Sequence, residues 1–125
     1  MKYTDESSLP EVTEQDLYAS LATTRPFTII ILKAGPAYSP PGPDRDPEVA
    51  ATILRHGRRN ASLRLAGLLR VVCPVTDGSD VAGIGVFDAT PEEVDLIYSR
   101  DPAVMAGVLT YEIHPTRTFP DSSLS

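Results

Sequence analysis

The chain has 125 residues, the size of a single domain, and 42% of them are hydrophobic, which is enough for a buried core. Its formal net charge of −6 argues against a nucleic-acid partner, because binding to phosphates depends on an excess of Lys and Arg. The single cysteine, Cys73, excludes an internal disulfide framework and a multi-cysteine zinc site.

No apolar run reaches the roughly 20 residues that a membrane span needs. The first residues are polar and lack the apolar core of a secretory signal. We therefore expect no membrane partner and a cytoplasmic location.

Residues 1–26 are expected to form an N-terminal extension with one short helix. Residues 1–12 are polar and acidic, which favours loose packing. Thr13 should begin the helix, because its hydroxyl can accept a hydrogen bond from the amide three residues on, and Arg25-Pro26 should end it. A helix this short is not stable alone, so we expect it to dock on another surface.

The body, residues 27–119, begins with a predicted strand over residues 27–32. This β-branched run without polar alternation is typical of a strand covered on both faces. After a loop rich in Pro and Gly, Asp46-Pro47-Glu48 begins a helix, since Asp can cap it and Pro suits its first position. Turning each residue by about 100° gives one packed face and one face in water. The packed face comprises Val49, Ile53, His56, Asn60 and Leu63, and the far face comprises Arg55, Arg58 and Arg59.

Three more strands and a second body helix are predicted after Gly67. The strands cover residues 68–73, 81–87 and 107–114, the helix covers residues 90–99, and residues 120–125 form a tail. The order strand, helix, strand, strand, helix, strand predicts an α+β, ferredoxin-like βαββαβ fold, with a four-stranded antiparallel sheet and both helices on one face. Because the first strand is apolar on both sides, a second copy should cover the other face, giving a homodimer.

Two segments of the body resemble the YCII-related proteins, a family of the dimeric α/β-barrel group. One segment contains His56, Leu63, Gly67-x-Leu69 and Cys73-Pro74; the other is Asp101-Pro102-x-Val104-x-Ala106-Gly107-Val108. The family's usual Gly-Pro after the second strand is Cys73-Pro74 here, and the Pro-rich loop is longer. The resemblance implies a dimeric barrel, an active site of His56 and Asp101, and no cofactor. Activities in related proteins include dehydrochlorination of a chlorinated hydroxyhydroquinone.

The residues themselves are compatible with this site. A carboxylate beside one imidazole nitrogen fixes the tautomer, favours the imidazolium, and leaves the other nitrogen to exchange a proton with a substrate. His56 would be the general acid or base and Asp101 its orienting partner. The alternative is structural: His56 makes a hydrogen bond inside the core, and Asp101 caps the turn before Pro102.

Four further residues are candidates for binding a substrate. Tyr38 and Ser39 follow the first strand and either approach the His56 pocket or lie in a mobile polar loop. Asn60 either bonds the substrate or His56, or is satisfied by backbone. Arg70 either attracts a substrate carboxylate or is an exposed strand residue.

Two classes of function follow from these patterns. The favoured hypothesis is a cofactor-independent enzyme that transfers a proton in an elimination, isomerisation or dehydrohalogenation of a small molecule. The alternative is a non-catalytic dimeric module that binds a metabolite or a protein through the N-terminal helix and the Pro-rich loop. No metal is expected, because the carboxylates are not clustered with His or Cys. Cys73 is more typical of a small buried strand residue than of a nucleophile.

Overall fold

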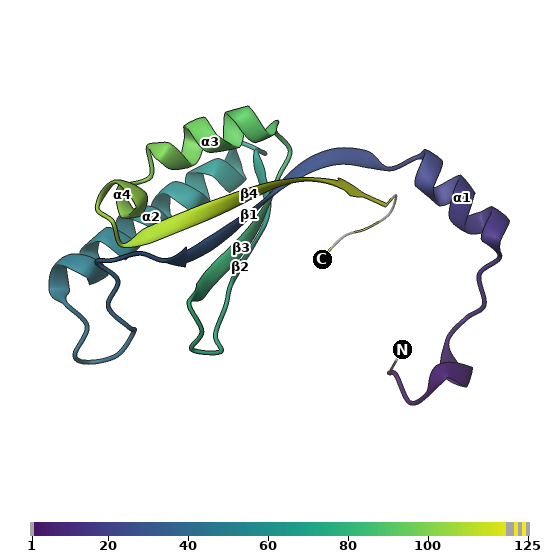
Figure 1. Ribbon diagram of the computed structural model, residues 1–125, viewed down its shortest axis with the longest axis horizontal. Helices are drawn as coiled ribbons and strands as arrows, with labels where there is room; N and C mark the ends of the chain where they lie inside the picture. Colours follow the sequence, from purple (N-terminus) through teal and green to yellow (C-terminus); the bar gives the residue numbers. More distant parts are fainter. Residues whose placement is uncertain (1, 120–121, 123, 125) are drawn as a thin grey trace.

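The computed structural model describes residues 2–119, 122 and 124. Within this part of the chain, the body is a four-stranded antiparallel sheet with the strand order β2-β3-β1-β4 (Figure 1). The strands are β1 (Arg25–Ala34), β2 (Leu69–Pro74), β3 (Val81–Phe87) and β4 (Leu109–Thr118). The helices are α1 (Glu14–Ala22), α2 (Pro47–Leu65), α3 (Pro91–Ser99) and α4 (Pro102–Met105), preceded by a 3-10 turn, η1 (Glu6–Ser8). The predicted α+β class is confirmed, and the order of elements is compatible with a ferredoxin-like fold.

The helices begin where local capping chemistry predicted. The Asp46 side chain accepts a hydrogen bond from the amide of Glu48 at 2.8 Å, so α2 starts at Pro47. Thr90 and Glu93 form a reciprocal capping box at the start of α3. The short helix α4 was not predicted: the sequence indicated only a turn at Asp101-Pro102, and one helical turn leaves no periodic pattern.

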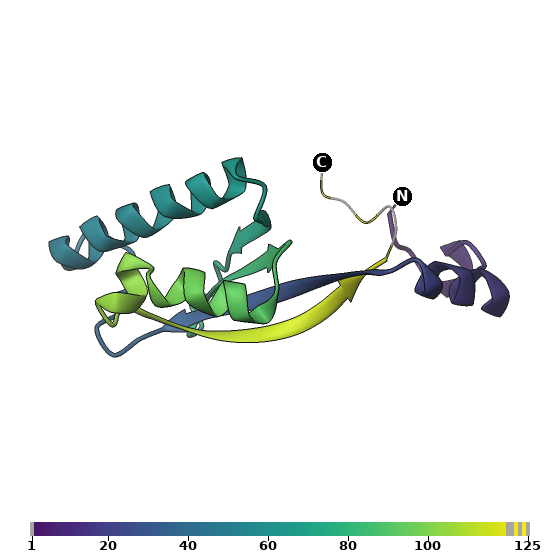
Figure 2. The ribbon, with the colours of Figure 1, turned by 90° about the horizontal axis from the view of Figure 1, so that it is seen from above.

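The three body helices cover one face of the sheet and leave the other open (Figure 2). Thr28, Ile30 and Leu32 of β1 are buried on the helix side, whereas the alternating residues Ile29 and Ile31 are only half-buried. This alternation follows from the pleat of a strand, in which successive side chains point to opposite faces. β1 therefore carries apolar side chains on both faces, as predicted, but a single chain covers only the face toward the helices.

The fourth strand is longer than predicted. We expected it to end at His114, but β4 continues to Thr118 and pairs with β1 as far as Arg25. Pro115 lies within β4 opposite Thr28, and proline is tolerated there because β4 is an edge strand. Proline can either end a strand or lie within an edge strand, and the local sequence does not distinguish the two cases.

The N-terminal helix α1 lies beyond the end of the sheet, away from the body (Figure 1, Figure 2). None of its residues is buried, and its apolar residues Leu17, Tyr18 and Leu21 are exposed. The expected docking of this helix is thus absent from the single chain. Of the predicted tail, residues 120, 121, 123 and 125 lie outside the described residues. No helix in the described part is both long and apolar enough to cross a membrane.

Candidate acid–base site

His56 and Asp101 meet in the interior between α2 and the start of α4. The ring nitrogen Nδ1 of His56 lies 3.0 Å from each carboxylate oxygen of Asp101. Asp101 is fully buried, and it also caps α4 by accepting a hydrogen bond from the amide of Ala103 at 3.0 Å. Both candidate roles of Asp101 are therefore present at once, since one carboxylate caps the helix and binds the histidine.

The other ring nitrogen of His56 faces Asn60, one helical turn further along α2. The Asn60 side-chain amide nitrogen lies 3.2 Å from Nε2, and the Tyr98 hydroxyl donates to the Asn60 carbonyl oxygen at 2.9 Å. Because Tyr98 occupies that oxygen, Asn60 presents its NH₂ group to His56, and Nε2 must accept. This arrangement selects the neutral tautomer of His56 that carries its proton on Nδ1.

Burial and neighbouring charge keep Tyr98 a hydrogen-bond donor. Its side chain is fully buried, with its ring edge-on to Phe87 at a centroid distance of 5.7 Å. Burial raises the pKa of Tyr98 far above its usual range, and the negative charge of Asp101 raises it further. The hydroxyl therefore stays protonated and available to Asn60.

Asp101 is ionised despite its burial. Burial by itself raises the pKa of Asp101, but the hydrogen bond from His56, the positive charge that the ring carries once it is protonated, and the backbone amides of Ala103 and Val104 outweigh it. The net result is a pKa below the usual range of an aspartate. A fixed negative charge therefore sits behind the imidazole, where it can stabilise a positive charge on the ring.

Arg59 is placed differently from its predicted position in water. Its Nη1 lies 3.7 Å from the Asp101 carboxylate, and this atom is buried without a hydrogen-bond partner among the described residues. Arg59 follows His56 by three positions, so the two side chains are neighbours on the helix surface. Its long stem can then swing toward the carboxylate, whereas Arg55 and Arg58 remain exposed as predicted.

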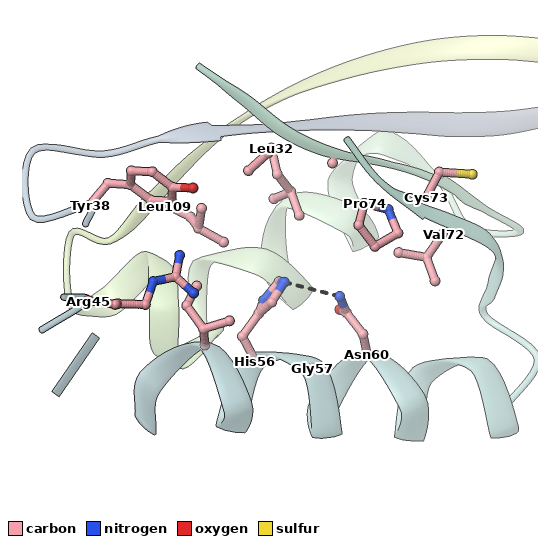
Figure 3. Close-up of a pocket in the computed structure, with 13 residues that line it drawn as sticks. Leu32, Tyr38, Arg45, His56, Gly57, Asn60, Val72, Cys73, Pro74 and Leu109 are labelled. Carbon is pink, nitrogen blue, oxygen red and sulfur yellow. Dashed lines mark hydrogen bonds between the residues drawn. The ribbon is translucent and has the colours of Figure 1, made fainter. Parts of the chain in front are cut away.

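A cavity of about 340 Å³ opens in front of His56 and Asn60, a size that suits a small organic molecule (Figure 3). It lies between α2, the strands and the loop after β1. Its lining is mostly apolar and comprises Leu32, Tyr38, Arg45, Ile53, His56, Gly57, Asn60, Val72, Cys73, Pro74, Ala82, Gly83 and Leu109. Asp101 does not line this cavity, so it can act on a bound molecule only through His56.

Of the four predicted substrate-binding residues, two line the cavity together with His56 and two do not. Tyr38 and Asn60 line the cavity. Ser39 lies next to Tyr38 but does not line the cavity; its hydroxyl accepts a hydrogen bond from the amide of Asp46 at 3.2 Å. Arg70 does not line the cavity either: it is exposed and its Nη1 lies 3.7 Å from Asp88, which matches the alternative of an exposed strand residue. The pairing of β2 with β3 is irregular between Leu69 and Val71, which breaks the alternation at Arg70, so Arg70 is exposed although Val72 and Pro74 line the cavity.

Cys73 also departs from expectation, because it is exposed rather than buried. It pairs with Ile84 across the sheet, and Figure 3 shows its sulfur pointing away from His56. Within the described residues, no group of three His, Cys, Asp or Glu side chains is placed to hold a metal ion.

Two residues of the site were not found from the sequence. Tyr98 is not among the predicted site residues, yet its hydroxyl completes the hydrogen bonds around Asn60. Arg45 is not among the predicted site residues either, yet its side chain lines the cavity. The one available signal was position: Arg45 directly precedes the Asp46 cap, so the start of α2 fixes its backbone.

Comparison with known proteins adds little to this geometry. No protein-family model matches the chain, and no curated protein matches it. One solved structure with some similarity is the RPA0582 protein of unknown function from Rhodopseudomonas palustris, a structural genomics target. Its TM-score is 0.35 and its sequence identity 14%, over 90% of this chain and 97% of that chain. The resemblance to YCII-related proteins stays a prediction.

The lowered pKa of Asp101 predicts a specific pH dependence of stability. The unfolded chain binds this proton more readily than the folded chain, so Asp101 stabilises the fold fully above its ordinary value of 3.8, and this contribution disappears as the pH falls through the lower folded value. Asp101→Asn should lower the free energy of unfolding by about 2 kcal/mol near neutral pH, because two charge-assisted hydrogen bonds become neutral ones.

The measurement is urea unfolding of both proteins across the acid range. The stability difference between wild type and Asp101→Asn should shrink as the pH drops below the ordinary aspartate value. Asp44→Asn, at an exposed loop position, is the control and should change stability little. A difference that stays constant down to the most acidic pH would contradict the account.

Proposed function

We propose that the protein is a cofactor-independent enzyme in which His56 transfers a proton to or from a small molecule bound in the cavity. The observation that carries this proposal is the placement of the His56 ring. One nitrogen is held by a buried, ionised carboxylate, and the ring borders a cavity of about 340 Å³. A histidine that served only the core would not need to border a cavity. The resemblance to YCII-related proteins favours the same pair of residues.

The neutral tautomer suits His56 to act first as a base. Its Nε2 lone pair faces Asn60, and both residues line the cavity, so a substrate can take the place of the Asn60 amide at Nε2. When the proton moves to Nε2, the ring becomes positive and Asp101 stabilises it.

The electron pair left on the substrate decides the outcome of the reaction. If it expels a leaving group from the neighbouring carbon, the result is an elimination or a dehydrohalogenation. If the substrate instead takes the proton back from Nε2 at another carbon, the result is an isomerisation. Both outcomes need a group that takes up a proton and can give it back, and Nε2 of His56 can do both. Asp101 is a positioning residue in this scheme because it does not reach the cavity.

The base can be tested before the natural substrate is known. The probe is 5-nitro-1,2-benzisoxazole: a base removes its C3 proton, the N–O bond breaks and a coloured phenolate forms. Wild type should accelerate this ring opening, and His56→Ala should lower the rate by roughly 100-fold or more, as for removal of a general base. The release of the phenolate is followed by absorbance.

The chain provides a matched control, because its only other histidine, His114, is exposed on β4. His114→Ala should react as fast as wild type. If His56→Ala kept the wild-type rate, His56 would not be the base and the proposed function would be wrong.

We also propose that two copies pack through the open faces of their sheets, as the dimeric α/β-barrel prediction requires. On that face, Ile29 lies opposite Val86 and Ile31 lies opposite Ile84, which is 40% exposed. A polar border lies beside these residues, where Lys33 forms an ion pair with Glu112 at 2.6 Å. An apolar centre with a charged rim is the usual anatomy of an interface between subunits.

Ile84→Glu should convert the dimer to a folded monomer, because it places a charge at the centre of the apolar face. Sedimentation velocity measures the oligomer, and circular dichroism checks the fold. Leu96→Glu is the control, since Leu96 is an exposed apolar residue of α3 and should leave the dimer intact. A wild type that sediments as a monomer would contradict this proposal.

A further inference from the structure

The cavity is lined by an arginine, Arg45, that forms no ion pair within the described part of the chain. Arg45 lies in the loop between β1 and α2, and its side chain lines the same cavity as His56. In Figure 3, Arg45 and Tyr38 lie on one side of His56, and Asn60 lies on the other. The cavity thus has a cationic end, an apolar middle and a proton-accepting histidine.

Arg45 is held in place by contacts that leave its outer nitrogens free. Its Nε donates to the carbonyl oxygen of Ser39 at 2.9 Å, and its guanidinium carbon lies 5.6 Å from the centre of the Tyr38 ring. The Ser39 hydroxyl accepts from the amide of Asp46 at 3.2 Å, so this serine joins the loop to the start of α2. Among the described residues, neither η nitrogen of Arg45 has a protein hydrogen bond.

The charges around Arg45 favour an anionic ligand. Arg25, Arg59 and Arg70 lie 3.0, 3.7 and 3.7 Å from an aspartate carboxylate, whereas Arg45 has no ion pair in the described part of the chain. Among the residues that the structure describes, no Asp or Glu lines the cavity. A guanidinium that lines a mostly apolar cavity and has no ion pair among the described residues can therefore attract a negative charge from outside the protein.

We propose that Arg45 binds the carboxylate of the substrate, so that the cavity takes a small organic carboxylate with an apolar body. Naming this molecule a substrate rests on the proposed function; the binding itself does not. The two η nitrogens suit a planar carboxylate, which accepts two parallel hydrogen bonds. Leu32, Ile53 and Leu109 would contact the apolar body, and the carbon that loses the proton would face His56.

Arg45 also suits the chemistry at His56. Removing a proton from a molecule that already carries a carboxylate brings a second negative charge close to the first. A guanidinium on the carboxylate offsets this repulsion, and it does so more strongly beside a mostly apolar lining than in open water. Arg45 therefore takes the carboxylate-binding role that the sequence suggested for Arg70. The same cavity then holds a cation for the carboxylate and a base for the proton.

The test compares two probes of nearly equal shape, benzoate and the neutral benzamide, by isothermal titration calorimetry. Wild type should bind benzoate more tightly than benzamide. Arg45→Gln should weaken benzoate binding by roughly tenfold or more, because charge-assisted hydrogen bonds are lost, while leaving benzamide unchanged. Arg58→Gln removes the same charge from the exposed side of α2 and should bind benzoate like wild type.

Two results would overturn the proposal: benzoate binding by Arg45→Gln as tight as by wild type, or no preference of wild type for benzoate over benzamide. The variant His56→Ala separates this proposal from the proposed function. It should still bind benzoate, because Arg45 remains. If His56→Ala also kept the wild-type rate of benzisoxazole opening, the anion site would stand and the catalytic role of His56 would fall.

Discussion

The interaction on which the site depends is the buried carboxylate of Asp101 with the donors that keep it ionised. A buried charge is costly unless its partners are in place, so the fold has to bring them together. One donor is the backbone amide at the start of α4, and the other is Nδ1 of His56 on α2. The same contact therefore holds two helices together and sets the orientation of the imidazole. The stability of the fold and the proposed proton transfer therefore depend on the same contact between His56 and Asp101.

Two further features adjoin the pair of His56 and Asp101: a chain of side-chain hydrogen bonds in the interior, and the cavity that His56 and Asn60 line. Asn60 and Tyr98 continue the hydrogen bonds on the interior side and select which ring nitrogen carries the proton. Apolar strand residues form walls of the cavity, and Arg45 is the one permanently charged residue in its lining within the described part of the chain. The result is an apolar space between a base and a cation, which is the arrangement that proton abstraction from a small carboxylate needs.

Local signals in the sequence were enough to predict the order of the body strands and of the two longer body helices. They also pointed to His56, Asp101, Asn60 and Tyr38 as candidate site residues. The caps at Asp46 and Thr90 gave the helix starts, and the spacing of His56 and Asn60 placed both on the packed face of α2. Contacts between distant segments could not be read in this way. Tyr98 meets Asn60 across 38 positions, and the direction of Arg45 depends on how the loop folds back on Ser39. Pro115 was misleading because its effect depends on whether the strand is at an edge, which only the topology decides.

The central claim is that the hydrogen bonds of Asp101, Asn60 and Tyr98 fix the tautomer of His56. Nitrogen-15 NMR of the histidine rings measures this directly, with the exposed ring of His114 as an internal reference. At a pH where the ring is neutral, the account predicts that Nδ1 of His56 carries the proton and that Nε2 is a free acceptor. A neutral ring with its proton on Nε2, or an even mixture of the two tautomers, would contradict it.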